Sequence, residues 1–308
     1  MEFLSIESIS PQAWDESIAT CGNPLIYHHA SWLRFLEETR PGKMVRFRIE
    51  DSGETAGYFA GMLTKKGPLT LLGSPLTGWV TDYLGPVVRN GADIDEIVGA
   101  LEKTCRRLRV DFLQVGSPVL PPELMRRRGY GVSEMKVFRI PLEADRDRMW
   151  RRLDGKCRNR IRKAERKGLE VRPCELDSFV DDYHAQHVDV FARQGLPPKY
   201  PIGVVRSLHR NLKARGQILC LRVVHDGRTV ATGLFPHDAE HLYSFGIASR
   251  GADLSLCPNE ILYWTAMCRG AELGLGSFSI GGNYRKPASG GNFKKKFHGE
   301  EVSIYRYT

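Results

Sequence analysis

The sequence predicts a mixed α/β (α+β) protein built from two similar halves. Helical segments alternate with strand-like segments along the chain, and each half has a group of alternating apolar runs at its centre. The 308 residues are enough for two ordinary domains. We therefore expect domains at residues 1–145 and 146–308, and the sequence leaves open whether the last strand returns to the first domain.

In the first half, the spacing of apolar residues predicts a helix at residues 30–38, which read ASWLRFLEE. The elements expected after it are strands at 45–50, 55–63 and 69–72, a helix at 94–108, a strand at 111–115, a helix at 120–128 and a strand at 137–142.

In the second half, a strongly basic helix at 151–168 comes first. The elements expected after it are a strand at 169–172, helices at 176–192 and 201–215, strands at 218–225, 229–236 and 241–247, a helix at 258–273 and a strand at 277–280. The sequence Asp-Gly-Arg at 226–228 supplies a turn between two of these strands.

The composition excludes several classes of protein. The longest uncharged stretch, residues 67–81, is interrupted by Pro and Gly, so no membrane span is expected. The N-terminal residues lack a basic segment, so we expect no secretory signal. The seven cysteines are scattered without a Cys-x-x-Cys pair, which is typical of reduced thiols and offers no zinc site. We expect a cytoplasmic protein.

The positive charge is concentrated in the basic helix. Residues 151–168 hold nine Lys or Arg and two acids, so they supply seven of the nine net positive charges. The residues at 153, 157, 161, 164 and 168 share one face, and Gly168 is suited to end the helix. A second stripe holds Lys156, Arg160, Lys163 and Lys167, and a third contains Arg158, Arg162 and Arg166.

Such a helix has two interpretations. It can be an ordinary solvated amphipathic helix. However, few acids are available to form i,i+4 pairs with so many cations, and a bound polyanion would relieve their repulsion. We therefore expect the helix to bind a phosphate-rich ligand such as tRNA, a nucleotide or coenzyme A.

Several sequence blocks resemble the FemABX-type transferases. One block opens the second half and another resembles the Gly-x-x-Phe-Lys-x-x-Phe element that closes this family's sequences. The blocks, in order, are YHHASWLRFLEE at 27–38, LDGKCRNRIRKAERKGLEV at 153–171, VFARQGLPPKY at 190–200, VVHDGRTVATGLF at 223–235, PNEILYWTAMCRGAELG at 258–274 and GGNFKKKFHGEEV at 290–302.

The resemblance implies tandem acetyltransferase-like (GNAT) domains, each a mixed sheet flanked by helices. It also implies amide-bond formation, with an aminoacyl group moved from aminoacyl-tRNA to a small-molecule or peptidyl amine and no other cofactor. Two alternatives stay open. One is an N- or O-acyltransferase that uses acyl-CoA, and the other is a basic nucleic-acid-binding module without catalysis.

The resemblance places the reaction near the closing block. Lys294 corresponds to the family's lysine and is expected near the reacting carbonyl, while Phe293 could stack on the terminal adenine of tRNA. Lys295 and Lys296 are weaker candidates for donor binding. The alternative is a strand with both phenylalanines inward and solvated lysines between them. Tyr263 is a candidate proton donor to the leaving hydroxyl, beside Tyr243 and Tyr284.

Departures from the family concern the acceptor. Its peptidoglycan-acting members carry a lysine four residues after a helical tryptophan, but here Trp32 is followed at that spacing by Leu36, with Arg34 the nearby cation. Arg193 is retained, and Lys199 replaces a second arginine. We therefore expect Arg34, Arg193 and Lys199 to contact an acceptor other than a UDP-linked precursor.

Two further motifs are weak. Residues 126–131, RRRGYG, match the pyrophosphate loop of acyl-CoA enzymes, but they end a predicted helix instead of opening one. His184 and His187 have a spacing seen in metal sites, yet they lack further ligands, so no metal is expected.

Overall fold

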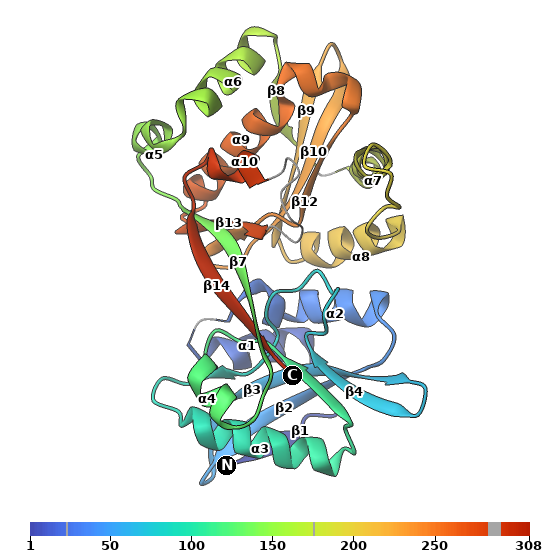
Figure 1. Ribbon diagram of the computed structural model, residues 1–308, viewed down its shortest axis with the longest axis vertical. Helices are drawn as coiled ribbons and strands as arrows, with labels where there is room; N and C mark the ends of the chain where they lie inside the picture. Colours follow the sequence, from blue (N-terminus) through green and yellow to red (C-terminus); the bar gives the residue numbers. More distant parts are fainter. Residues whose placement is uncertain (23, 175, 283–290) are drawn as a thin grey trace. The chain divides into compact units, whose positions relative to one another are not determined.

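The computed structural model describes residues 1–22, 24–174, 176–282 and 291–308. The chain forms two compact units, and each is described by itself. The first contains Met1–Met135 with Ser303–Thr308, and the second contains Lys136–Val302. Helices and strands alternate in both, which confirms the mixed α+β class (Figure 1). No helix in the described part of the chain is both long and apolar enough to cross a bilayer.

The first unit has a mostly antiparallel sheet with four helices. The strand order is β1 (Glu2–Ser5), β2 (Lys43–Asp51), β3 (Glu54–Lys66), β4 (Leu69–Ser74), β6 (Phe112–Val115), β14 (Glu300–Tyr307) and β7 (Val132–Pro141), and β5 (Val87–Val88) pairs with β3. The helices are α1 (Pro11–Ala19), α2 (Ala30–Thr39), α3 (Ile94–Arg107) and α4 (Pro122–Arg127), with a 3₁₀ turn at Ile26–His28.

The core of the first unit includes its last strand. Phe3, Phe47 and Phe59 lie within 5.7–6.3 Å of one another, measured between ring centroids, under the apolar face of α3. Tyr307 of β14 is fully buried in the same core, and its hydroxyl donates a hydrogen bond to the carbonyl oxygen of Leu120. Residues from both ends of the sequence therefore complete this core.

The second unit has two groups of strands. One sheet runs in the order β12 (Gly246–Ser249), β10 (Arg228–Pro236), β9 (Ile218–His225) and β8 (Glu170–Pro173), and the other group is β7, β13 (Ser277–Gly282) and β11 (His241–Tyr243). The helices are α5 (Arg146–Arg152), α6 (Gly155–Arg166), α7 (Ser178–Ala192), α8 (Ile202–Lys213), α9 (Pro258–Glu272) and α10 (Gly291–Lys295), with a 3₁₀ segment at Gly251–Leu256.

The strand predicted at residues 241–247 is divided in the structure. Its first part, β11, pairs in parallel with β13, and its second part, β12, pairs with β10. The change of partner falls between two adjacent residues: the Ser244 N–H donates to the carbonyl of Ser279, and the Phe245 N–H donates to that of Leu234. A single alternating pattern cannot reveal such a change, because both parts keep the period of a strand. The sheet of the second unit splits at this point.

Helices cover both faces of β10 beside the split. On one face, Thr232 donates a hydrogen bond to Gln186 of α7, and on the other, Phe235 contacts Tyr263 of α9. Figure 1 shows α7 and α9 on opposite sides of these strands. This explains why β10 is buried at every residue from Val230 to Pro236.

The basic helix has the predicted face but starts later than expected. Leu153, Cys157, Ile161 and Ala164 are all buried, and Gly168 has a φ of +76°, as its position after the helix requires. However, residues 151–168 do not form one helix. The Asp154 side chain accepts a hydrogen bond from the Lys156 N–H and caps α6, which separates α6 from α5.

Candidate active site

The point where the sheet splits carries a pair of hydroxyls, one on a buried tyrosine and one on a half-buried serine. Tyr263, from α9, is 4% exposed and its hydroxyl lies 3.0 Å from the Ser244 hydroxyl. The rings of Phe235, Phe278, Phe293 and Phe297 surround it at centroid distances of 5.3–6.2 Å. Burial raises the pKa of Tyr263 to about 12, so the phenol keeps its proton at neutral pH and can act as a donor.

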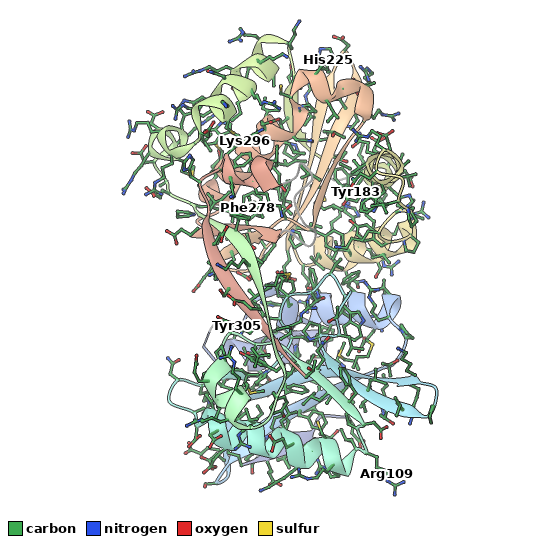
Figure 2. The ribbon with its side chains drawn as sticks, viewed as in Figure 1. Arg109, Tyr183, His225, Phe278, Lys296 and Tyr305 are labelled. Carbon is green, nitrogen blue, oxygen red and sulfur yellow. The ribbon has the colours of Figure 1, made fainter. Side chains whose placement is uncertain are left out.

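A second pair of hydroxyls reaches the same part of the sheet, from Tyr183 of α7 and from Tyr200 in the segment between α7 and α8. The hydroxyls of Tyr183 and Tyr200 are 2.7 Å apart, and both side chains are buried (Figure 2 labels Tyr183). They lie over Gly246, the first residue of β12. The pKa of Tyr183 is raised well above its usual value, mainly by burial and further by the hydroxyls of Tyr200 and Tyr263. Hydroxyls from α7 and α9 therefore converge where β11 and β12 separate.

The close approach of these hydroxyls requires a glycine at position 246. A Cβ added there would lie 2.2 Å from the Tyr183 hydroxyl oxygen and 3.3 Å from that of Tyr200. We expect Gly246→Ala to lower the free energy of unfolding by about 1–3 kcal/mol, the usual effect of overpacking a core. Tyr183→Phe in the same chain should recover part of the loss, because it removes the atom in the shortest contact. Denaturant unfolding of the single and double variants measures this, and an equally unstable double variant would contradict the steric explanation.

The closing block is a short helix and not a strand. Residues Gly291–Lys295 form α10 and the backbone then turns, so the alternative of a strand with lysines between two inward phenylalanines is wrong. Phe293 and Phe297 instead meet on one face, 5.5 Å apart, and both contact Tyr263. Four residues make about one helical turn, so this spacing suits a helix as well as a strand.

Lys294 lies at the end of β13. Its ammonium donates a hydrogen bond to the carbonyl oxygen of Gly282 at 2.9 Å, and it lies near Gly281, whose φ is +71°. The side chain is half-buried, whereas Lys295 is exposed. The same strand, β13, accepts a hydrogen bond from the Ser244 N–H at Ser279, and the Ser244 hydroxyl contacts Tyr263, so β13 connects the surroundings of Lys294 and Tyr263.

Glu260 is a member of this site that the sequence did not reveal. It lies in the first turn of α9 and its side chain is 4% exposed. One carboxylate oxygen is 3.2 Å from the Lys296 ammonium and 3.1 Å from a guanidinium nitrogen of Arg160. A buried carboxylate of this kind has no periodic signature, and its partners lie 36 and 100 residues away in sequence. Figure 2 labels Lys296 beside α9 and α10.

The remaining cations of the basic helix have different surroundings. Lys156, Lys163 and Lys167 are exposed, and no acid in the described part of the chain pairs with Lys163 or Lys167. Arg158 instead donates to the carbonyl oxygens of Arg151 and Leu153, at the C-terminal end of α5. These lysines are accessible, as are Arg162 and Arg166, whereas Arg158 connects α5 to α6.

The cations predicted to bind an acceptor also have partners within the fold. Arg34 pairs with Glu37 and Glu38 of its own helix in the first unit. Arg193, at the end of α7, donates to the carbonyl oxygen of Ser249 and pairs with Asp189. The Lys199 side chain is exposed, and its backbone N–H donates to the imidazole of His187. Their binding roles stay predictions.

The weaker candidates have identifiable surroundings. His187 is buried against the Tyr200 ring, and burial lowers its pKa to about 4, so it is a neutral acceptor at pH 7. Among the described residues no group of three or more His, Cys, Asp or Glu is placed to hold a metal ion. The Tyr243 hydroxyl donates to Asp238, and Tyr284 lies outside the described residues.

The comparisons with known proteins agree with this architecture. Residues 155–295 match the family model described as the acetyltransferase (GNAT) domain. The crystal structure of FemX superposes with a TM-score of 0.79 at 13% identity, over 99% of this chain and 97% of FemX. The chain has the fold of FemX. The resemblance of the sequence blocks to the FemABX-type transferases is thereby confirmed at the level of fold.

Two other solved structures share the fold of FemX and of this chain. A tandem GNAT protein from the clavulanic acid biosynthesis pathway has a TM-score of 0.58 at 12% identity, covering 100% of this chain and 98% of its own. L-PGS from Bacillus licheniformis has a TM-score of 0.59 at 12% identity, covering 97% and 91%. The predicted tandem GNAT architecture is confirmed. No curated protein matches the sequence significantly.

Proposed function

We propose that the protein is an amide-forming acyltransferase that moves an aminoacyl group from aminoacyl-tRNA to a small-molecule or peptidyl amine. The observation that carries this proposal is the position of Lys294 and Tyr263 beside the split sheet of a domain matching the GNAT model. The exposed lysines of α6 belong to the same unit and supply a surface for a polyanion.

The chemistry needs little beyond positioning and charge. An aminoacyl ester is already activated, so a neutral amine can attack its carbonyl without a covalent enzyme intermediate. The Lys294 ammonium would stabilise the negative charge that develops on the carbonyl oxygen. The Tyr263 phenol, protonated at neutral pH, would donate a proton to the departing ribose hydroxyl. Phe293, beside Tyr263, would stack on the terminal adenine.

The structure around α9 disfavours acyl-CoA as the donor. Acyl-CoA enzymes of this fold hold pyrophosphate with backbone amides between a strand and a helix N-terminus. The equivalent segment here follows β12, where the Gly251 N–H is already bonded to the Asp189 carboxylate. Asp253, two residues after Gly251, is buried, and Glu260 lies in the first turn of α9. Each of these carboxylates pairs with a cation of the fold: Asp189 with Arg193, Asp253 with Arg228, and Glu260 with Lys296 and Arg160. What disfavours a pyrophosphate here is therefore the Gly251 N–H, which already has an acceptor.

The GNAT model match keeps an acyl-CoA-dependent N- or O-acyltransferase as the second candidate. The other match to the acyl-CoA pattern, residues 126–131, closes α4, and Gly129 has a φ of +88° after the helix. These residues therefore end a helix and lead into β7, as the sequence predicted. A loop of this kind presents no helix N-terminus to a phosphate.

The decisive experiment is a comparison of donors. Transfer of a labelled amino acid from charged tRNA to a mixture of amines should proceed with the purified protein and stop after ribonuclease treatment. The matched reaction with acetyl-CoA should give no product. Product formed at full rate from acetyl-CoA alone would contradict the proposal in favour of the second candidate.

We also propose that the protein works in the cytoplasm, where aminoacyl-tRNA is made. All seven cysteines are free thiols with buried side chains. Burial raises the pKa of the Cys157 thiol to about 12 and that of Cys105 to about 11. Thiols of this kind are unreactive, which supports a role in packing.

A further inference from the structure

Lys294 needs a fixed position to act on a reacting carbonyl, yet it belongs to a helix of only five residues. Such a helix has little stability of its own. Its position must therefore come from contacts with the rest of the unit. The described contacts are of four kinds: the hydrogen bond from Lys294 to Gly282, the phenylalanines packed on Tyr263, a backbone bond from Asp154 and an ion-pair cluster.

The backbone bond joins the segment after α10 to the start of α6. The Asp154 N–H donates to the carbonyl oxygen of Lys296 at 2.9 Å. The same Asp154 caps α6 through its side chain, so one residue both begins the basic helix and holds Lys296. The closing segment is thereby attached directly to the helix proposed to receive the donor's phosphates.

The ion-pair cluster joins the same two parts through α9. The Glu260 carboxylate is buried and contacts Lys296 on one side and Arg160 on the other. The Lys296 ammonium also lies 5.3 Å from the centre of the Phe293 ring, so the ion pair is in contact with the first residue of the segment Phe293–Phe297. Arg160 is 52% exposed and can therefore meet solvent or a ligand while it pairs with Glu260.

We propose that Glu260 is a positioning residue that holds the segment Phe293–Phe297 against α6 and α9 and so fixes Lys294 beside the sheet split. A buried carboxylate between two cations is directional, because each cation must stay near it to compensate its charge. Glu260 itself need not touch either substrate. This role of Glu260 in catalysis rests on the proposed transferase function.

Glu260→Gln tests this role, because glutamine keeps the size and removes the charge. Without the charge, Lys296 and Arg160 lose their common partner, and the closing segment should loosen. We expect kcat for aminoacyl transfer to fall by about 10- to 100-fold, since small displacements at a reacting centre have effects of this size. Binding of charged tRNA should be unchanged or tighter, because Arg160 is released and the surface gains positive charge.

A loss of kcat without a loss of tRNA binding separates positioning from a structural defect. Partial unfolding would lower kcat and the amount of tRNA bound by the same factor, and this joint loss would overturn the proposal. The matched control is Glu272→Gln, which changes an exposed carboxylate on the same helix and should alter neither quantity.

Hydrogen exchange gives a readout that does not depend on any reaction. In Glu260→Gln, the amides of Asp154, Phe297 and His298 should exchange at least tenfold faster, because their hydrogen bonds involve the closing segment. Amides of α3 in the first unit serve as the internal reference. Unchanged exchange at all three amides would overturn the positioning role even if catalysis were lost.

A double variant tests the pairing itself. Lys296→Met keeps the aliphatic stem and removes the second charge. If the pair acts as one unit, Glu260→Gln with Lys296→Met should be no worse in exchange than either single variant, whereas additive losses would overturn the coupling. If no donor supports transfer by the wild-type protein, the proposed function fails, while the exchange measurements still decide whether Glu260 holds the segment.

Discussion

Lys294→Ala lowers the turnover number for aminoacyl transfer by about 10²–10³ and changes the affinity for charged tRNA much less. The expectation follows from the role proposed for the ammonium. A charge that forms only as the amine attacks is stabilised by a group that contributes little to ground-state binding. Loss of one such electrostatic donor usually costs this much in rate. Single-turnover transfer and tRNA binding, measured on the same preparation, separate the two quantities.

Substitution of Lys294 also removes a structural contact. Lys294 also donates a hydrogen bond to Gly282, so its removal could loosen the end of β13. Lys294→Met keeps the apolar stem, and its unfolding midpoint should match the wild type while turnover stays low. Lys294→Arg should rescue only partly, since a planar guanidinium cannot replace a compact ammonium in a confined site.

Lys295→Ala is the matched control for Lys294, since Lys295 is the next residue, carries the same charge and is exposed. We expect its turnover to stay near the wild-type value. If both alanine variants remain within about threefold of wild type, smaller than any loss expected for an electrostatic donor, the reaction does not take place at this segment.

Charge reversal on the accessible face of α6 should weaken tRNA binding and flatten its dependence on salt. Lys163→Glu with Lys167→Glu removes two exposed cations without disturbing the buried face of the helix. Counterion release contributes roughly 0.7–0.9 to the log–log salt slope for each phosphate contact. The slope should therefore fall by about 1.4–1.8, and more if the new carboxylates repel neighbouring phosphates. Filter binding over a range of salt concentrations measures it.

Two other cations of the basic helix are unsuitable for charge reversal. Arg160 pairs with buried Glu260 and Arg158 bonds to α5, so reversing either would disturb the fold as well as the surface. The control is Lys103→Glu with Arg106→Glu, which makes the same charge change on exposed residues of α3 in the first unit. Equal losses in both double variants would mean that net charge, not this face, determines binding.

The sequence predicted most elements because local patterns determine them. The helix expected at 94–108 is α3 at Ile94–Arg107, and the strand expected at 111–115 is β6 at Phe112–Val115. Four of the five residues predicted on one face of the basic helix are buried, since apolar spacing marks them, and the fifth, Gly168, is exposed where the helix has ended. Lys294 was named through the resemblance to a known family and Tyr263 as a candidate proton donor. In the structure the Lys294 ammonium bonds to the end of β13 and the Tyr263 hydroxyl lies beside Ser244, and their catalytic roles stay predictions.

Features that depend on distant partners could not be predicted in this way. The division of residues 241–247 arises from pairing with strands on either side and leaves no mark in the alternation. The helical form of the closing block depends on Tyr263, Glu260 and Asp154, which lie far from it in sequence. Glu260 itself resembles an ordinary acid at a helix start, where such residues are common.

The burial of Tyr307 in the core of the first unit has a consequence for synthesis on the ribosome. The first 135 residues emerge early, yet the strand that fills their core belongs to Ser303–Thr308. Until those residues leave the exit tunnel, the nascent first unit exposes the apolar groove that Tyr307 later fills. A ribosome-associated chaperone would have time to bind there while the second unit is translated. A stop codon just before position 303 should therefore yield a product that is degraded or aggregates, even though it retains all but six of the 308 residues.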